Sequence, residues 1–278
     1  MDKIINGKKI ADHYKQEIKE TINKLNKKLK LVVIQVGDNP ASNVYIKKKQ
    51  ELCEEMNINF ALQKYSTISE ENLIAEINKL NNLKEVTSIL VQLPLPDNIN
   101  PNKIIEAIDP KKDVDGLTSA NLGKLFAKEQ AIVPCTALGV VKLLEYQNLD
   151  LNGKKIVIVG RSKLVGLPLI ALLLNKNATV TVCHSKTKNL EDETKRADIL
   201  IVAIGKKEFI TKEMIKKDAI IIDVGINRCN NKLYGDVAFD NVYEKCSLIT
   251  PVPKGVGPMT VIMLINNIIE CYNIQTKN

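Results

Sequence analysis

Short apolar runs alternate with helix-like segments along nearly the whole chain. The apolar residues of the helix-like segments recur every three or four positions, as on one face of a helix. Helices are expected at 10–29, 41–56, 70–80 and 134–146. Strands are expected at 31–36, 58–63, 87–92, 155–159, 179–183, 199–203, 219–224 and 248–250. Because strands that alternate with helices pair in parallel, the predicted fold class is α/β.

The length and composition indicate a folded protein of two domains. The 278 residues are about twice a typical domain length, and the junction is expected near 134–136. A content of 45% hydrophobic and 26% charged residues argues against disordered, collagen-like and coiled-coil chains. No apolar stretch approaches the ~20 residues of a membrane span, and the polar start lacks a signal-peptide core. We therefore expect no membrane association.

The cysteines, histidines and charges constrain location and partners. The six cysteines form no Cys-x-x-Cys pair, and the two histidines fit no zinc-ligand spacing. This pattern predicts a reducing cytoplasm and no metal. The net charge is +8, but lysines alternate with acidic residues instead of forming basic runs. An anionic small molecule is thus a better candidate partner than a nucleic acid.

A glycine turn follows the expected strand 155–159. Gly160 and Gly166 flank this turn, and Ser162 replaces the second glycine of the usual dinucleotide fingerprint. Gly160 would permit the tight turn, Gly166 would let the helix pack closely, and the helix N-terminus would face a phosphate. The motif is weak by itself, because a glycine turn in an α/β domain can also bind nothing.

The residues after the second strand of this unit favour NADP over NAD. A NAD-binding protein would place an acid there for the ribose 2′-hydroxyl, but the residues are His184, Ser185 and Lys186. With Arg161 nearby, they suit a 2′-phosphate. His184 is more readily explained as a hydrogen-bonded structural or ribose-side residue than as a catalytic one.

Lys49 lies on the expected apolar face of helix 41–56, which Ser42 could cap. The spacing places five residues on this face: Tyr45, Lys49, Leu52, Cys53 and Met56. An inward lysine must snorkel, find a partner, or lose its proton more easily through desolvation. It could then transfer protons next to Tyr45 and hold a flat substrate against that ring. The helix alone does not decide between these possibilities.

Two polar residues follow strands or loops of the first half. Gln92 ends an apolar run and could hydrogen-bond Lys49. Asp115 could accept two hydrogen bonds from the amino-pyrimidinone edge of a pterin, or could form an Asx turn. Asp113 is then the solvated alternative. Ligands of parallel sheets bind outside the carboxyl ends of the strands, where both Gln92 and Asp115 are expected.

Several separate motifs resemble those of one family when taken together. They are GDNPAS at 37–42, VQLPLP at 91–96, KDVDG at 112–116, PCT at 134–136, GRS at 160–162, CHS at 183–185 and TPVP at 250–253. In this order, and with Tyr45 and Lys49, they resemble the bifunctional methylenetetrahydrofolate dehydrogenase/cyclohydrolase (FolD) family. The resemblance runs from about residue 6 to the helix after residue 260, nearly the whole chain.

The resemblance implies residue roles. Lys49 corresponds to the catalytic lysine and Gln92 to its partner. Tyr45 corresponds to the ring stacked on the folate, and Asp115 to the pterin anchor. Further substrate contacts implied by the family are Val91, Leu93, Pro253, Gly255 and Gly257. The implied NADP contacts are Gly160, Arg161, Ser162, Ser185 and Ile226.

The resemblance also implies the reactions and the domain layout. A hydride would pass from 5,10-methylenetetrahydrofolate to NADP, and water would convert the methenyl product into 10-formyltetrahydrofolate, which supplies purine, methionine and histidine biosynthesis. Residues 1–136 with 262–278 would form the folate-binding catalytic domain, and 137–261 a Rossmann-type NADP-binding domain. The active-site cleft would lie between them, and the enzyme would be a cytoplasmic homodimer.

Two positions depart from the family pattern. Lys254 stands where glycine is usual, and Ala137 where proline is usual. If position 254 needs a positive φ, lysine costs roughly 1 kcal/mol or more there; otherwise it only adds a cation near the folate. Ala137 loses a helix-start preference and should have little effect. A dehydrogenase without cyclohydrolase activity and a non-catalytic NADP sensor are the alternatives, and Lys49 with Gln92 argues against both.

Overall fold

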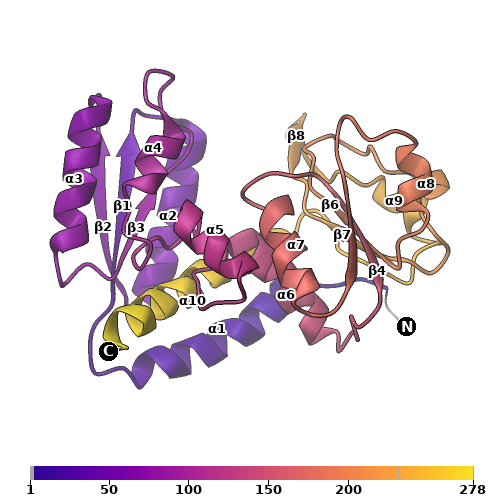
Figure 1. Cartoon of the computed structure of the whole chain (residues 1–278), viewed down its shortest axis with the longest axis horizontal. Coiled ribbons are helices and arrows are strands. Elements are labelled where there is room, and N and C mark those ends of the chain that lie inside the picture. Colours follow the sequence, from indigo (N-terminus) through magenta and orange to yellow (C-terminus); the bar gives the residue numbers. More distant parts are fainter. Residues whose placement is uncertain (1–2, 231, 278) are drawn as a thin grey trace. The chain divides into compact units, whose positions relative to one another are not determined.

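The computed structural model describes residues 3–230 and 232–277, apart from the side chain of Ala41. The chain divides into two compact units (Figure 1). The three-strand unit comprises Lys15–Val133 and the residues from Leu264 onward. The five-strand unit comprises the residues up to Tyr14 together with Pro134–Met263. The helices α1 (Gly7–Asn23) and α10 (Val256–Thr276) each contribute to both units.

The three-strand unit is built on a parallel sheet of order β2-β1-β3. Its remaining elements are β1 (Lys30–Val36), α2 (Pro40–Glu55), β2 (Asn59–Tyr65), α3 (Glu70–Asn82), β3 (Ser88–Val91), α4 (Pro101–Glu106) and α5 (Ser119–Phe126). Figure 1 shows α3 along this sheet. Its residues Leu73 and Ile77 pack against Val32, Ile34 and Ile89 of the strands, and this apolar contact holds the helix on the sheet.

The five-strand unit contains a parallel sheet of order β10-β7-β6-β4-β5 and an antiparallel pair, β8-β9. Its strands are β4 (Lys155–Val159), β5 (Thr179–Cys183), β6 (Ile199–Val202), β7 (Ile220–Asp223), β8 (Asn227–Cys229), β9 (Lys232–Tyr234) and β10 (Leu248–Ile249). Its helices are α6 (Cys135–Tyr146), α7 (Gly166–Leu174), α8 (Leu190–Thr194), the 3₁₀ turn η1 (Lys212–Met214) and α9 (Phe239–Val242). The α/β class and the parallel pairing are therefore confirmed.

The first helix ends earlier than its sequence pattern predicts. We expect a helix over 10–29, but α1 ends at Asn23. Leu29 continues the apolar period and is buried, yet it lies in the segment before β1, where its carbonyl accepts the Asn59 N–H. Its apolar character therefore reflects tertiary burial and not a helical face.

The N-terminal segment belongs to a different unit from the one expected. Residues 1–136 are expected in one domain, but the segment before α1 pairs with β10 in the five-strand unit. The Ile5 N–H donates to the Ile249 carbonyl at 2.8 Å, and the Ile249 N–H donates to the Lys3 carbonyl at 2.8 Å. These backbone bonds extend the edge of the sheet, which explains why the first residues join that unit.

None of the helices in the described part of the chain is long and apolar enough to cross a membrane.

Candidate functional site

Lys49 and Gln92 meet in the three-strand unit. Lys49 lies on α2, and Gln92 directly follows β3. The Lys49 Nζ donates to Gln92 Oε1 at 3.0 Å. Gln92 Nε2 donates to the Leu93 carbonyl at 2.8 Å, and the Gln92 N–H to the Ile34 carbonyl at 2.8 Å. These bonds fix the amide so that its oxygen faces the ammonium group, and the predicted hydrogen bond between the two side chains is confirmed.

The buried face of α2 differs from the predicted one. Ser42, Ile46, Cys53 and Met56 are buried, and Lys49 is half-buried among them. Tyr45 is 50% exposed, so its predicted place on the apolar face is wrong. The reason is that the positions 42, 46, 49, 53 and 56 repeat every three or four residues and form the stripe that packs on the sheet. Lys49 belongs to this stripe, whereas Tyr45 lies beside it and presents its ring outward.

The two aspartates of the KDVDG segment differ in exposure, and Asp113 is not solvated as expected. Asp113 is only 1% exposed, and its carboxylate accepts the Thr118 N–H at 2.8 Å and Asn121 Nδ2 at 3.1 Å. It is therefore a structural residue, and the expectation of a solvated side chain is wrong. Asp115 is half-buried, and both aspartates line a cavity of about 10 Å³, the size of one water molecule, with Val91 and Leu93. Asp115 is the more exposed of the two carboxylates.

The glycine turn of the five-strand unit has the close contacts that the sequence predicts. Gly160 has a φ of 128°, and a Cβ there would lie 2.3 Å from the Ala203 carbonyl oxygen. A Cβ at Gly166 would lie 2.2 Å from the Gly160 carbonyl oxygen. Neither position has room for a side chain, because the unit's own backbone lies against it, and this close packing of strand, turn and helix is typical of dinucleotide-binding turns. The Ser162 hydroxyl accepts the Val165 N–H at 3.2 Å and helps to shape the turn.

The ends of β4 and β5 lie side by side and carry polar, exposed side chains. The Gly160 N–H donates to the Cys183 carbonyl at 2.9 Å, so Arg161 and Ser185 each follow one of two paired strand ends. Both side chains are exposed. His184 is held in the turn, because its Nδ1 accepts the Lys186 N–H at 3.1 Å. This contact fits the structural interpretation of the histidine and not a catalytic one.

The segment after β10 is shaped by close backbone contacts. A Cβ at Gly255 would lie 2.4 Å from the Pro251 carbonyl oxygen. A Cβ at Gly257 would lie 3.9 Å from Ile226 Cδ1, so Gly257 faces Ile226, which is itself 53% exposed. Pro253, Gly255, Gly257 and Ile226 thus belong to the same unit as Gly160.

Lys254 has a φ of 81°, which resolves the two possibilities for this position. Lysine occupies a left-handed conformation that glycine adopts without strain. Replacing Lys254 with Gly should therefore raise the free energy of unfolding by about 0.5–1 kcal/mol. This is the difference between the backbone strain that glycine relieves in the folded state and the conformational entropy that it adds to the unfolded chain. Urea unfolding measures this gain. Lys9→Gly, in the exposed face of α1, is the control and should be destabilising; a loss for Lys254→Gly as well would contradict the argument.

Two buried aspartates, Asp223 and Asp236, were not predicted from the sequence. Asp223, at the end of β7, accepts the N–H groups of Gly225, Asp236 and Val237. Asp236 accepts those of Ile204, Gly205 and Lys206. Burial raises the pKa of Asp223 to about 6, against the opposing effect of its three backbone donors. The sequence signal that could have identified them is a glycine within two residues of each aspartate, Gly225 after Asp223 and Gly235 before Asp236. In the structure a Cβ at either glycine would collide with the carboxylate of the other aspartate.

No group of three or more His, Cys, Asp and Glu side chains within residues 3–230 and 232–277 is placed to hold a metal ion.

Known families match this chain along almost its full length. Residues 5–115 match the catalytic domain of tetrahydrofolate dehydrogenase/cyclohydrolase, and residues 134–276 match the NAD(P)-binding domain of the same enzymes. The chain belongs to the tetrahydrofolate dehydrogenase/cyclohydrolase family. This membership confirms the resemblance derived from the motifs, and with it the expected bifunctional enzyme.

Relatives and solved structures agree with this assignment. The "Bifunctional protein FolD" of Lachnoclostridium phytofermentans is 51% identical over 272 residues, which cover 96% of each chain. That of Enterococcus faecalis is 50% identical over 280 residues and covers 99% of this chain and 100% of the relative. The FolD structure from Campylobacter jejuni superposes with a TM-score of 0.94 at 45% identity, covering 98% of this chain and 99% of the other.

A further structural match bears on the cofactor. FolD of Trypanosoma brucei, solved in complex with NADP and an inhibitor, has a TM-score of 0.91 and 32% identity, and covers 99% of this chain and 98% of that one. Together with the NAD(P)-binding domain match, it supports the expectation of NADP as the cofactor. The tight glycine turn between β4 and α7 is the kind of turn that binds a dinucleotide phosphate in related folds.

Proposed function

We propose that this chain oxidises 5,10-methylenetetrahydrofolate with NADP and hydrolyses the methenyl product to 10-formyltetrahydrofolate, with Lys49 as the residue that moves the proton. The observation that carries this proposal is the contact of 3.0 Å between Lys49 Nζ and Gln92 Oε1. It holds a half-buried ammonium group next to the strand end where ligands of parallel sheets bind. A lysine that merely snorkelled to water would have no such partner.

Most of the proposed folate contacts belong to the three-strand unit. The exposed ring of Tyr45 offers a flat apolar surface for the pterin, one helical turn from Lys49. Asp115 accepts hydrogen bonds from the amino-pyrimidinone edge, because it is the more exposed carboxylate of its segment. Val91 and Leu93 lie close to Asp115, with which they line a cavity of about 10 Å³, and are proposed as apolar contacts of the folate by family resemblance. Pro253, Gly255 and Gly257 are further proposed substrate contacts, by family resemblance.

The two reactions make different demands on the protein. NADP, when bound, accepts the hydride from the one-carbon bridge. That step needs orientation of the folate, which Tyr45 and Asp115 provide. Water that adds to the methenyl carbon loses a proton, and the bond from that carbon to N5 then breaks as N5 gains a proton. In this proposal Lys49, in its uncharged form, takes up the proton of the attacking water and passes a proton to N5, and Gln92 positions the lysine for both transfers. A dehydrogenase without cyclohydrolase activity would have no use for the pair.

The NADP contacts are proposed to be Gly160, Arg161, Ser162, Ser185 and Ile226 of the five-strand unit. Arg161 and Ser185 stand at neighbouring strand ends, and no acid follows β5 to repel a 2′-phosphate. This arrangement supports a preference for NADP over NAD.

Arg161→Ala should weaken NADP binding by about 1.5–3 kcal/mol, because a charge-assisted hydrogen bond to phosphate has that strength. Binding of NAD, which lacks the phosphate, should change little. Calorimetric titration with both nucleotides measures the two effects. Arg196→Ala removes another exposed arginine of the same unit and serves as the control. Equal losses for NADP and NAD would show that Arg161 does not recognise the 2′-phosphate.

Asp115→Asn should reduce folate binding in both reactions while NADP affinity stays nearly unchanged, since Asp115 belongs to the three-strand unit and the proposed NADP contacts belong to the five-strand unit. KM for the folate and Kd for NADP are the measurements. Asp113→Asn is the informative comparison: it should lower stability instead, because its carboxylate accepts two buried hydrogen bonds. A large loss of NADP affinity in Asp115→Asn would make Asp115 a structural residue.

The function as a whole is tested with the purified protein, methylenetetrahydrofolate and NADP. Absorbance of the methenyl product should rise and then decay as it is hydrolysed. Accumulation without decay beyond the spontaneous rate would leave only the dehydrogenase. Equal efficiency with NAD would refute the assignment of Arg161 and Ser185.

The proposal extends to assembly and location. We expect a cytoplasmic homodimer that supplies one-carbon units for purine, methionine and histidine biosynthesis, by family resemblance. The six cysteines, all within the described residues, form no disulfide bond, which suits a reducing compartment. Sedimentation analysis of the purified protein tests the dimer, and a monomer at micromolar concentration would contradict it.

A further inference from the structure

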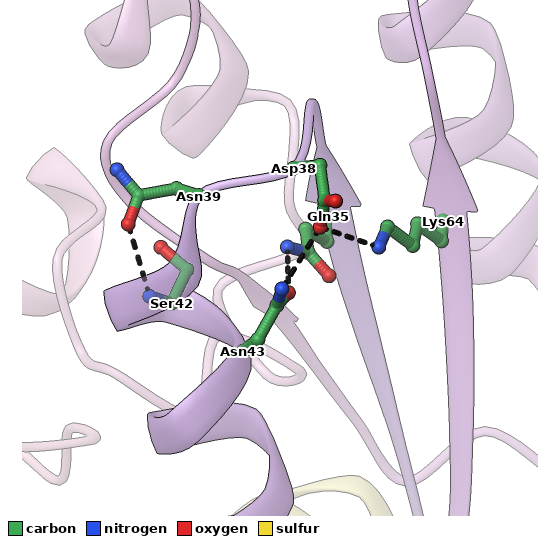
Figure 2. A network of polar contacts seen from close by, with 6 residues as sticks. All are labelled: Gln35, Asp38, Asn39, Ser42, Asn43 and Lys64. Atoms are coloured by element: carbon green, nitrogen blue, oxygen red, sulfur yellow. Dashed lines mark hydrogen bonds and ion pairs between the residues drawn. The ribbon is translucent and has the colours of Figure 1, made fainter.

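A buried amide stands at the end of β1 without a role in the reactions proposed above. Gln35 is 3% exposed and donates from Nε2 to Asn43 Oδ1 at 2.7 Å (Figure 2). Asn43 lies in the first turn of α2, the helix that carries Lys49. Burying a glutamine amide in a strand costs free energy unless the amide is hydrogen-bonded, and the bond to Asn43 offsets this cost. The presence of a polar side chain at this buried position therefore calls for an explanation.

The side chain of Asn43 is held from both ends. Its oxygen accepts from Gln35, and its Nδ2 donates to Asp38 Oδ1 at 2.8 Å. Lys64, on β2, donates to the same carboxylate oxygen at 2.8 Å, and this bond, followed by that from Asn43, lowers the pKa of Asp38. Figure 2 shows Gln35 next to Asn43, and Asn43 and Lys64 both directed at Asp38. The network therefore ties the first turn of α2 to two strands.

The start of α2 is also fixed through its backbone. The Asn39 side chain accepts the Ser42 N–H at 3.2 Å, so Asn39 caps the helix and the predicted cap at Ser42 is wrong. Asn39 precedes Pro40, whose ring suits the first helical position. The cap sets where the helix begins, whereas the Gln35 contact sets how its first turn lies on the sheet.

Gln35 has a counterpart on the neighbouring strand. β1 and β3 pair in parallel with Ile34 opposite Val91, so Gln35 and Gln92 follow this pair on adjacent strands. Both glutamines contact α2: Gln35 through Asn43, and Gln92 through Lys49. Two hydrogen bonds from the same edge of the sheet thus fix the helix at two points six residues apart. Apolar packing alone would allow it to rotate or slide more freely, because that packing is non-directional.

We propose that Gln35 and Asn43 are positioning residues for Lys49, and that their hydrogen bond sets the placement of α2 on the sheet. This inference rests on the proposed role of Lys49. The pair touches no reacting atom; it acts through the helix. Loss of the bond should let the Lys49 side chain move from its place beside Gln92, and a misplacement of about 1 Å can slow a catalysed step about a hundredfold.

The test compares Gln35→Met and Asn43→Ala with the wild type in both reactions. Each variant breaks the bond from one side, and Asn43 is exposed, so its replacement does not threaten the core. We expect kcat for methenyl hydrolysis to fall about tenfold or more in each. KM for the folate and Kd for NADP should stay within about twofold, and the dehydrogenase should lose less. A purely structural role would instead lower both activities together, in proportion to the unfolded fraction.

Gln63→Met on β2 is the matched control, because it makes the same substitution on the neighbouring strand. It should leave both activities unchanged. Both single variants remove the bond between Gln35 and Asn43, and Asn43→Ala also removes the bond to Asp38. The double variant should therefore be no slower than Asn43→Ala alone. Multiplicative losses, or hydrolysis at the wild-type rate in both single variants, would overturn the inference.

The companion variant Lys49→Met separates this inference from the proposed function. If Lys49→Met abolishes hydrolysis while Gln35→Met and Asn43→Ala do not slow it, the positioning role fails and the function stands. If Lys49→Met itself hydrolyses normally, the role of Lys49 fails and the positioning role fails with it.

Discussion

Replacing Lys49 with Met should lower methenyltetrahydrofolate hydrolysis by more than about a hundredfold, the effect expected of general acid–base catalysis. Methionine matches the unbranched shape of lysine and is tolerated among Ile46, Cys53 and Met56, so the variant should fold. The dehydrogenase should survive better, because its chemistry belongs to the cofactor. Hydrolysis rates at equal folded concentration, with circular dichroism as the check on folding, measure the difference.

Lys48→Met is the matched control for this prediction. Lys48 is the preceding residue and is exposed, so the same change of charge and shape should leave hydrolysis near the wild-type rate. If Lys49→Met kept more than about a tenth of the activity, Lys49 would be a binding or structural residue.

Replacing Asp236 with Asn should destabilise the five-strand unit by about 3–5 kcal/mol, because several buried donors lose a carboxylate acceptor together. Asp236 is fully buried, and its two oxygens accept three backbone N–H groups of the segment after β6 and the Asn227 Nδ2. An amide retains one oxygen and turns an NH₂ group toward the remaining donors. The midpoint of urea unfolding should therefore drop, and NADP affinity should fall as well.

The loss of NADP affinity follows from where this segment lies. It continues from Ala203, whose carbonyl oxygen lies against Gly160 in the expected NADP turn. Asp240→Asn, at an exposed position four residues further along, is the control and should be nearly neutral. An unfolding midpoint for Asp236→Asn within the range of that control would show that the backbone donors find other partners.

Local patterns were sufficient for the strands and for the dinucleotide turn. The expected strands 155–159 and 179–183 coincide with β4 and β5. Runs of β-branched residues bounded by turn formers leave few alternatives, because such side chains favour extended backbone. The roles of Gly160 and Gly166 could also be predicted locally, because a glycine in this motif marks a place where the backbone packs too closely for a side chain.

Burial of individual polar residues could not be predicted from local sequence. Asp113 and Asp115 stand two residues apart in the same loop, yet Thr118 and Asn121 donate to Asp113 and so decide which one is structural. Tyr45 and Ser42 both lie on α2, and the direction in which the helix packs exposes one and buries the other. Asp223 and Asp236 lie on either side of the antiparallel pair β8-β9, which brings them together in a way that no spacing rule predicts.

The sequence by itself determined the α/β class, the parallel pairing, the family and the identity of Lys49 and Gln92 as candidates. These follow from periodicity and from motifs, which are properties of neighbouring residues. The tertiary structure alone decided that Lys49 has a partner, that Lys254 adopts a positive φ and that Gln35 anchors α2. Each of these depends on contacts between segments distant in the chain or on the backbone geometry that such contacts impose, and these are fixed only when the strands and helices pack together.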